Sequence, residues 1–311
     1  MKIVCVESLG IGRETFDALA AHYSALGHVF HYYLDRRENE ATLIERMADA
    51  EVVVVSNIKL PAPVLSQCPH LRYLSVGFTG LDHIDLGYCQ AHGIAVQNAA
   101  GYSTTAVSEL AVGMMLDLMR GVTALDGTLR QGKSRGAFLG RELRGKTVGI
   151  VGTGAIGIAT ARLLLAFGAK VVAYSRSHRP EVEALGIAYL PLEALLRQSD
   201  IVSLHTPLTD ATRHLIGIPE LALMKPTALL INTARGPVCD INAVANALQN
   251  GTIAGAAFDV FEQEPPLPST HPLLGAPHCL LTPHVAFATE ESFAARADIV
   301  FAHVDQWLQQ Q

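Results

Sequence analysis

Side chains suited to binding a carboxylate and moving a proton stand in the second half of the chain. Each comes directly after a short run of Val, Ile, Leu or Ala: Arg235, then the acids Asp259, Glu262 and Glu264, then His284. An arginine fork matches the two oxygens of a carboxylate. A carboxylate bonded to an imidazole fixes its tautomer, and such a histidine can protonate a carbonyl oxygen while a hydride reaches the carbon. These residue types therefore indicate acid–base chemistry on a carboxylate-bearing molecule.

A glycine-rich turn follows another apolar run near the middle of the chain. Gly152, Gly154 and Gly157 form the pattern G-x-G-x-x-G between the run 148–151 and an apolar helical segment. In a dinucleotide-binding turn the first glycine permits the bend, the second admits a pyrophosphate, and the third allows close helix–strand packing. The N-terminus of the helix adds free N–H groups and a positive dipole end. The order of strand, glycines and helix predicts a dinucleotide site.

The next strand of this unit lacks the acidic residue that usually bonds the ribose of NAD. Ser175 stands at the expected place, 18 residues after Gly157, and Arg176 follows it. A hydroxyl beside a guanidinium suits a 2′-phosphate through charge-assisted bonding. The alternative is that Arg176 stacks on adenine or lies in solvent and that NAD is used. We therefore expect NADP or NAD as cofactor, with NADP slightly favoured.

Short apolar runs recur along the chain and alternate with helix-like segments. The runs are nearly continuous, which is typical of strands buried on both faces of a parallel sheet. They span residues 3–6, 52–55, 73–76, 148–151, 171–174, 201–204, 228–231, 256–258 and 279–281. Alternation of strands and helices predicts the α/β class with two doubly wound parallel sheets.

The chain has 311 residues, which is long enough for two domains. The glycine motif begins well inside the chain, so another α/β unit must precede the nucleotide unit. We expect a Rossmann dinucleotide-binding domain at 101–286, inserted into a flavodoxin-like substrate domain made of 1–100 and 287–311. One long helical stretch at 103–130 would lead into the inserted domain.

Composition argues against several other classes. The net charge is −6 and only 17% of residues are charged, which is unlike the basic footprint of a nucleic-acid binder. No apolar run reaches membrane-spanning length, and the N-terminus looks like a strand instead of a signal peptide. Five scattered cysteines without a C-x-x-C pair indicate neither a disulfide framework nor a zinc site. We therefore expect a cytoplasmic protein with no metal and no nucleic-acid or membrane partner.

Four motifs in order resemble the signatures of the D-isomer-specific 2-hydroxyacid dehydrogenases, over essentially the whole chain. They are Gly152-x-Gly154-x-x-Gly157, Asn232-Thr233-Ala234-Arg235-Gly236, Asp259-Val260-Phe261-x-x-Glu264-Pro265 and Thr282-Pro283-His284. The segment 77–85 is also similar to the family's substrate-side loop. The resemblance implies hydride transfer between NAD(P)H and C2 of a small 2-oxo or D-2-hydroxy acid, such as glyoxylate or hydroxypyruvate.

The resemblance also implies the catalytic roles. Arg235 grips the substrate carboxylate and orients its carbonyl. His284 is the general acid and base, and Glu264 is its partner. Backbone N–H groups of Gly77 and Phe78 bind the carboxylate as well.

A second implied set contacts the cofactor. Asp259 bonds the nicotinamide carboxamide, and the segment His205-Thr206-Pro207 lies beside the adenosine. In full, the expected cofactor contacts are Gly152, Gly154, Ala155, Ile156, Gly157, Ser175, Arg176, His205, Thr206, Pro207, Thr233, Ala234 and Asp259.

Departures from the family pattern leave the substrate open. Val285-Ala286-Phe287 follows the histidine where the family often has Trp or small residues, and Phe78 is larger than its counterpart in many members. Formate dehydrogenases pair their histidine with Gln, whereas this chain offers Glu264. The chain ends at Gln311, right after its last helix, which argues against the regulatory domain of many phosphoglycerate dehydrogenases.

A non-enzymatic alternative stays open. Corepressor-like members of the family sense NAD(H) without metabolic turnover and keep the same three catalytic-type residues, although they carry extensions that this sequence lacks. A plain dinucleotide-binding module would not need those residues.

The stretch 103–130 also predicts an assembly. Its apolar residues recur near helical spacing and form a broader surface than one small domain usually covers: Val107, Leu110, Ala111, Met114, Met115, Leu118 and Met119. We expect this helix to lie in a homodimer contact. The alternative is a helix buried wholly within its own subunit.

Overall fold

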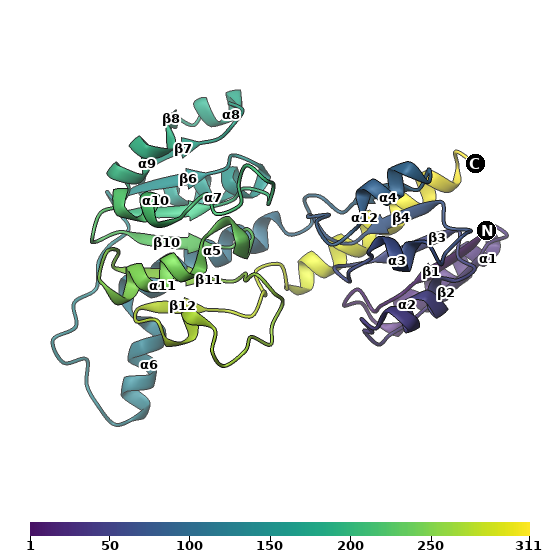
Figure 1. Ribbon diagram of the computed structural model, residues 1–311, viewed down its shortest axis with the longest axis horizontal. Coiled ribbons are helices and arrows are strands. Elements are labelled where there is room, and N and C mark those ends of the chain that lie inside the picture. Colours follow the sequence, from purple (N-terminus) through teal and green to yellow (C-terminus); the bar gives the residue numbers. More distant parts are fainter. The chain divides into compact units, whose positions relative to one another are not determined.

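The computed structural model describes residues 1–311, which divide into two compact units (Figure 1). One unit combines residues 1–103 with 288–311, and the other comprises residues 104–287. The first unit is therefore discontinuous in sequence, and the second is inserted into it.

The first unit contains a five-stranded parallel sheet in the order β2-β1-β3-β4-β5. This is the flavodoxin-like strand order. The strands are β1 (Lys2–Cys5), β2 (Val29–Tyr32), β3 (Val52–Val55), β4 (Tyr73–Val76) and β5 (Ala95–Asn98). Only the interior strands β1, β3 and β4 are buried almost throughout, whereas β2 and β5 alternate exposed and partly buried residues at the edges. The apolar runs predict the interior strands alone, because edge strands are not continuously apolar.

Five helices accompany this sheet: α1 (Arg13–Ala25), α2 (Glu40–Met47), α3 (Ala62–Leu65), α4 (Leu86–Ala91) and α12 (Glu290–Leu308). The helix α12 comes from the end of the chain and packs beside α1. The ring of Phe301 lies 6.5 Å from that of Tyr23 and 5.9 Å from that of Phe30, measured between centroids. The Ser75 hydroxyl of β4 donates to the Val300 carbonyl at 3.0 Å. The end of the chain thus completes the core of the first unit.

The second unit contains a seven-stranded parallel sheet in the order β12-β11-β10-β9-β6-β7-β8. The strands are β6 (Thr147–Val151), β7 (Lys170–Tyr174), β8 (Ala188–Tyr189), β9 (Ile201–Leu204), β10 (Leu229–Asn232), β11 (Gly255–Phe258) and β12 (Cys279–Leu281). The direction of the winding reverses between β6 and β9, and open α/β sheets bind ligands outside the carboxyl ends of strands at such a point. The predicted class, two doubly wound parallel sheets, is confirmed.

The helices of this unit are α5 (Thr104–Arg120), α6 (Val122–Arg130), α7 (Ala155–Ala166), α8 (Pro180–Glu183), α9 (Leu192–Gln198), α10 (Ile218–Leu223) and α11 (Ile241–Gln249). Two 3-10 turns, η1 (Gly236–Val238) and η2 (Pro272–Gly275), complete it. Across the chain all five cysteines are free, and four of them are buried. None of the helices has the length and apolar character that crossing a bilayer requires.

The single helix expected over 103–130 is two helices, so that prediction is wrong. Gly121 adopts φ = 62°, a left-handed conformation that does not continue an α-helix, and it ends α5. The Asp117 carboxylate then accepts the N–H of Thr123 at 2.7 Å and its hydroxyl at 3.0 Å, which fixes the start of α6. Figure 1 shows α6 and the loop after it extending away from the seven-stranded sheet.

The apolar side chains of α5 are largely used inside the chain. The helix contacts α7, β10 and β11, and the members of the expected surface that it buries are Val107, Ala111, Met114, Met115 and Met119. Leu110 and Leu118 pack against the same core while partly buried. Most of the broad apolar surface that the sequence predicts on this helix is therefore covered within the subunit.

Candidate active site

The glycine motif forms a tight turn between β6 and α7. Gly152 adopts φ = 101°, and a Cβ there would lie 2.5 Å from the His205 carbonyl oxygen. A Cβ on Gly157 would lie 2.1 Å from the Gly152 carbonyl oxygen, so this glycine permits the close packing of helix on strand. Gly154, in contrast, has no atom within 4 Å of its Cβ position. The middle glycine thus faces open space, as an approaching pyrophosphate requires.

Three further observations fit a dinucleotide at this edge of the sheet. No side chain caps the N-terminus of α7, which leaves its first N–H groups for an anion. The segment that starts at His205 is held against the turn, because His205 N–H donates to the Val151 carbonyl at 2.7 Å. The Thr233 hydroxyl is buried without a hydrogen-bond partner. A buried polar atom of this kind usually has a partner, which points to a ligand.

The end of β7 carries the residues expected near the ribose. Ser175 is partly buried and Arg176 is exposed. Their basic neighbours are already paired: Arg179 lies 3.3 Å from Glu181, and His178 lies 3.8 Å from Glu183. Arg176 has no carboxylate partner of this kind, so it is the arginine of this turn that is available to an anion.

Tyr189 joins this turn to the glycine motif, a role that the sequence analysis does not predict. Its hydroxyl donates to the Thr153 hydroxyl at 2.9 Å and accepts the Arg179 N–H at 3.1 Å. The Tyr189 ring also stacks on His178, with centroids 4.0 Å apart. Because Tyr189 lies in the two-residue strand β8, no periodic signal in the sequence marks it.

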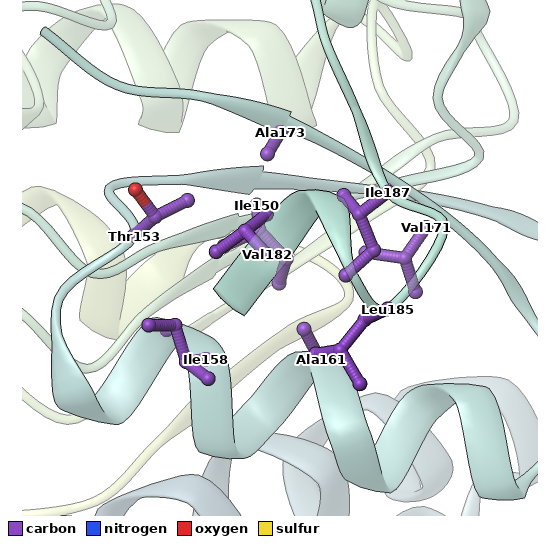
Figure 2. Close-up of a pocket in the computed structure, with 10 residues that line it drawn as sticks. Ile150, Thr153, Ile158, Ala161, Val171, Ala173, Val182, Leu185 and Ile187 are labelled. Atoms are coloured by element: carbon purple, nitrogen blue, oxygen red, sulfur yellow. The ribbon is translucent and has the colours of Figure 1, made fainter. Parts of the chain in front are cut away.

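An apolar crevice lies behind the glycine turn, between α7, α8 and the strands β6 and β7. Figure 2 shows Ile158 and Ala161 of α7 facing Val182 and Leu185, with the Thr153 hydroxyl as the one polar group among the labelled side chains. The crevice is too narrow to hold a water molecule. It is a packing seam and does not serve as the dinucleotide site.

The loop after β10 presents Arg235. The buried Asn232 side chain closes this loop, because its amide donates to the Arg235 carbonyl at 2.9 Å and its oxygen accepts the Ala234 N–H at 3.0 Å. The Arg235 guanidinium donates to the Ala234 carbonyl at 2.8 Å. Asn232 therefore positions the arginine, although the sequence analysis assigns it no role.

His284 and Glu264 lie side by side after β12 and β11. The Nδ1 atom of His284 is 2.9 Å and 2.8 Å from the two carboxylate oxygens of Glu264, so the Nδ1 proton is shared with the carboxylate. The other ring nitrogen, Nε2, is then the atom that exchanges a proton with a substrate. The Phe287 ring packs edge-on against the imidazole, with centroids 5.3 Å apart.

Asp259 anchors the backbone that carries His284. Its carboxylate accepts the Thr282 hydroxyl at 2.6 Å and the N–H groups of Val285 and Ala286 at 2.8 Å each. Burial raises the pKa of Asp259, and these three donors oppose that shift. A carboxylate has about four acceptor positions, so one remains for another donor.

Gly236 brings the arginine loop against the loop that leads to Glu264. A Cβ on Gly236 would lie 2.0 Å from the carbonyl carbon of Phe261. Any side chain at this position would therefore push the two loops apart. Arg235, Glu264 and His284 share one edge of the sheet because they follow three neighbouring parallel strands, and Gly236 allows the first two loops to approach closely.

The remaining expected site residues, Gly77 and Phe78, follow β4 in the first unit. The Gly77 N–H donates to the Val55 carbonyl at 2.7 Å, so it is already paired within that unit. Phe78 is buried, and its ring packs edge-on against His83 with centroids 6.0 Å apart.

Comparisons with known proteins agree with this geometry. The profile of the D-isomer specific 2-hydroxyacid dehydrogenase NAD binding domain matches residues 112–286. A glyoxylate reductase of Thermofilum pendens is 40% identical over 279 residues, covering 87% of this chain and 82% of the relative. A hydroxypyruvate reductase of Blautia hydrogenotrophica is 32% identical, covering 99% and 97%.

A solved structure extends the match to the whole fold. The NADPH-dependent glyoxylate/hydroxypyruvate reductase of Sinorhizobium meliloti, in complex with NADP and malonate, superposes with a TM-score of 0.85. It is 34% identical, and the match covers 99% of this chain and 93% of that one. Fold and site together define an NAD(P)-dependent oxidoreductase of the doubly wound α/β class. More narrowly, the chain belongs to the family of D-isomer-specific 2-hydroxyacid dehydrogenases.

Proposed function

We propose that this protein reduces a short 2-oxo acid, such as glyoxylate or hydroxypyruvate, to the D-2-hydroxy acid. The observation that carries this proposal is the His284–Glu264 pair, in which both carboxylate oxygens hold Nδ1 and leave Nε2 for the substrate. The names of the relatives, glyoxylate reductase and hydroxypyruvate reductase, support the substrate class.

The proton and the hydride come from different groups. When bound, the nicotinamide cofactor supplies the hydride that reaches C2. The substrate carbonyl oxygen takes the proton from His284 Nε2 and becomes a hydroxyl, which leaves a neutral imidazole. Glu264 stabilises the imidazolium before transfer and keeps the ring oriented throughout. In the oxidation direction, neutral Nε2 accepts the hydroxyl proton.

Arg235 holds the substrate carboxylate in this proposal, since its planar fork pairs with both oxygens. The Phe78 N–H adds a backbone donor in this proposal, whereas the Gly77 N–H expected beside it is already paired with the Val55 carbonyl. A substrate whose carboxylate is held in this way presents its carbonyl to His284 in one orientation, and such orientation is worth much of the rate.

The dinucleotide occupies the second unit in this proposal, and the first unit supplies substrate contacts. Asp259 uses its remaining acceptor position for the nicotinamide carboxamide. Gly152, Gly154, Ala155, Ile156 and Gly157 surround the pyrophosphate, His205, Thr206 and Pro207 lie beside the adenosine, and Thr233 and Ala234 lie towards the nicotinamide.

We further propose that NADP is preferred over NAD. Arg176 pairs with the 2′-phosphate and Ser175 bonds it, whereas Arg179 is already paired with Glu181. Arg176→Ala should raise KM for NADPH about tenfold to a hundredfold while leaving KM for NADH nearly unchanged. Ser175→Asp should turn the preference towards NADH by repelling the phosphate. A wild-type enzyme with the higher kcat/KM for NADH would contradict this assignment.

The protein is proposed to be a homodimer, whose contact is formed by the second part of the expected stretch 103–130 and by the loop after it. The helix α6 and the loop 131–141, here called the α6 arm, have no buried residue. Leu129 is 72% exposed and Leu139 is 83% exposed. A short amphipathic helix is marginal in water without packing, so a second copy of this chain is the proposed cover.

One experiment tests the proposed reaction. Steady-state rates would be measured with glyoxylate, hydroxypyruvate, pyruvate and longer 2-oxo acids, each with NADPH and NADH. His284→Ala should lower kcat by about 10²- to 10⁴-fold while NADPH still binds, since general acid–base catalysis supplies about that much. Binding of NADPH without turnover of any 2-oxo acid would instead favour a dinucleotide-sensing protein.

A further inference from the structure

A buried arginine lies beneath the substrate-side segment of the first unit. Arg296 belongs to α12 and is only 3% exposed. Its guanidinium donates to the Ser56 hydroxyl at 3.0 Å through Nη1 and to the Leu9 carbonyl through Nη2. It also lies over the Phe293 ring, 4.3 Å from the centroid.

The same side chain supports Gly77 in two ways. The Arg296 stem lies against the glycine, since a Cβ on Gly77 would be 3.3 Å from Arg296 Cδ. In addition, the Ser56 hydroxyl that accepts from Arg296 donates to the Gly77 carbonyl at 3.3 Å. Ser56 thus links the buried cation to the backbone of the segment that the proposed function assigns to the substrate carboxylate.

An acidic residue completes this arrangement. Glu7 is 5% exposed, and its carboxylate accepts the Ser56 N–H at 2.8 Å. Its other oxygen pairs with Arg36 at 2.9 Å. Leu9, Ser56 and Gly77 follow β1, β3 and β4, so Arg296 and Glu7 tie together the loops at the carboxyl edge of the three interior strands.

Packing of α12 alone does not explain a charge at this position. Burial lowers the pKa of Arg296, which is the sign of a cation removed from water. Its Nε atom has no hydrogen-bond partner although it is buried. A buried cation is costly unless its donors are used, and the donors of Arg296 are used on the groups that follow β1 and β3. The fork therefore orders these loops.

We propose that Arg296 is a positioning residue for substrate binding, which holds Ser56 and the Gly77–Phe78 backbone in the conformation that receives the substrate carboxylate. This inference rests on the proposed function of that segment. Arg296 touches neither substrate nor cofactor in this role. Its cationic charge also adds a favourable field for a carboxylate beside that backbone.

The test separates substrate affinity from folding. Arg296→Met keeps an unbranched stem and removes the fork and the charge. It should raise KM for the best 2-oxo acid about tenfold or more, the effect of losing a hydrogen bond to a charged group. The value of kcat should fall by a smaller factor than KM rises, and the affinity for NADPH should stay as in the wild type. The KM of Arg296→Lys should lie between those of the wild type and Arg296→Met. Ser56→Ala should also raise KM, although it leaves the buried charge in place.

A matched control is the other buried arginine of this unit. Arg46 bonds the Val6 carbonyl at 2.8 Å and the Asp35 carboxylate at 2.8 Å but contacts neither Ser56 nor Gly77. Arg46→Met should leave KM unchanged. An equal rise in KM for Arg46→Met would overturn the proposal, because it would show a general loss of structure.

A second measurement does not depend on turnover. In the protein without substrate, amide hydrogen exchange of a peptide covering residues 73–80 should quicken in Arg296→Met, while exchange of a peptide covering 147–157 should not change. Unchanged exchange together with unchanged KM would overturn the positioning role. If the wild type reduced no 2-oxo acid, the proposed function would fail, and the exchange of residues 73–80 would still decide whether Arg296 orders that segment.

Discussion

The conformation of His284 is costly, and neighbouring residues maintain it. The residue has φ = 55°, one of four non-glycine residues in the chain with a left-handed backbone. Such residues persist where the surroundings fix them, and they cluster at functional sites. Asp259 supplies the restraint by binding the two N–H groups that follow the histidine. The residue types predict the histidine and leave three acids as its possible partner, and only the family resemblance singles out Glu264. Hydrogen bonds to backbone N–H groups leave no signal in a sequence.

His205 gives a pH dependence to the stability of the second unit. Burial lowers the pKa of His205 from its usual value near 6.5 to about 4, and its ring bonds the Ser203 hydroxyl at 2.9 Å. Above pH 6.5 both folded and unfolded states hold a neutral ring. Below it the unfolded state binds the proton first, so stability falls until about pH 4. The full difference in unfolding free energy is on the order of 3 kcal/mol.

This prediction is checked by urea unfolding without cofactor at several pH values between 7.5 and 4.5. The variant His205→Gln retains a side-chain amide in place of Nε2 and cannot be protonated, so it should lose less stability over that range than the wild type. If the unfolding free energies of the two proteins fell equally between pH 7.5 and 4.5, His205 would not contribute to the pH dependence of stability.

At the scale of elements, glycines and strand ends place the site. Six of the seven strands of the second unit follow from apolar runs, and the catalytic residues stand at the ends of three of them. The strands β2 and β5 escape such prediction because polar residues interrupt them, and β8 escapes it because it has only two residues. The close approach of the Arg235 and Glu264 loops also escapes it, since only the fold shows that Gly236 meets the Phe261 backbone.

Gly236→Ala should therefore damage catalysis without removing any catalytic group. The added methyl would force the two loops apart, and a misplacement of about 1 Å costs on the order of a hundredfold in rate. We expect kcat/KM for the 2-oxo acid to fall by about that factor while NADPH still binds, as measured by steady-state kinetics and fluorescence titration.

Gly275 offers the matched control. It lies in η2 of the same unit, has no positive φ, and has nothing within 4 Å of its Cβ position. Gly275→Ala should keep wild-type kinetics. If Gly236→Ala behaved in the same way, the loop contact would be irrelevant to catalysis.

At the scale of the whole molecule, apolar surface decides assembly. The sequence predicts a broad apolar surface on one long helix. In the structure α5 buries most of that surface inside the subunit, and other apolar residues are exposed on the α6 arm. A sequence pattern reports hydrophobicity but not the direction of a helix after Gly121. The break at that glycine separates a core element from a projecting one.

The homodimer prediction then rests on the α6 arm. Light scattering at micromolar concentration should give about twice the 33.3 kDa mass of the chain. The double variant Leu129→Asp with Leu139→Asp should shift the mass towards a single chain, because two charges would be buried in the contact.

Ile218→Asp serves as the control for this experiment. Ile218 is 70% exposed on α10 of the same unit, outside the α6 arm. This variant should remain dimeric. A single-chain mass for the wild type would contradict the assembly itself, and a dimer that survives both leucine changes would place its contact elsewhere.

The return of α12 to the first unit sets an order of events during synthesis on the ribosome. The helix covers the sheet through Phe301 and Val300, and its Trp307 stacks on Tyr73 with centroids 5.0 Å apart. These contacts do not exist until α12 has been translated. The inserted unit is complete earlier, and domains tend to fold as they emerge. The sheet face that α12 covers is therefore exposed in the nascent chain after the inserted unit has emerged, and we expect that face to be the one that a chaperone would bind.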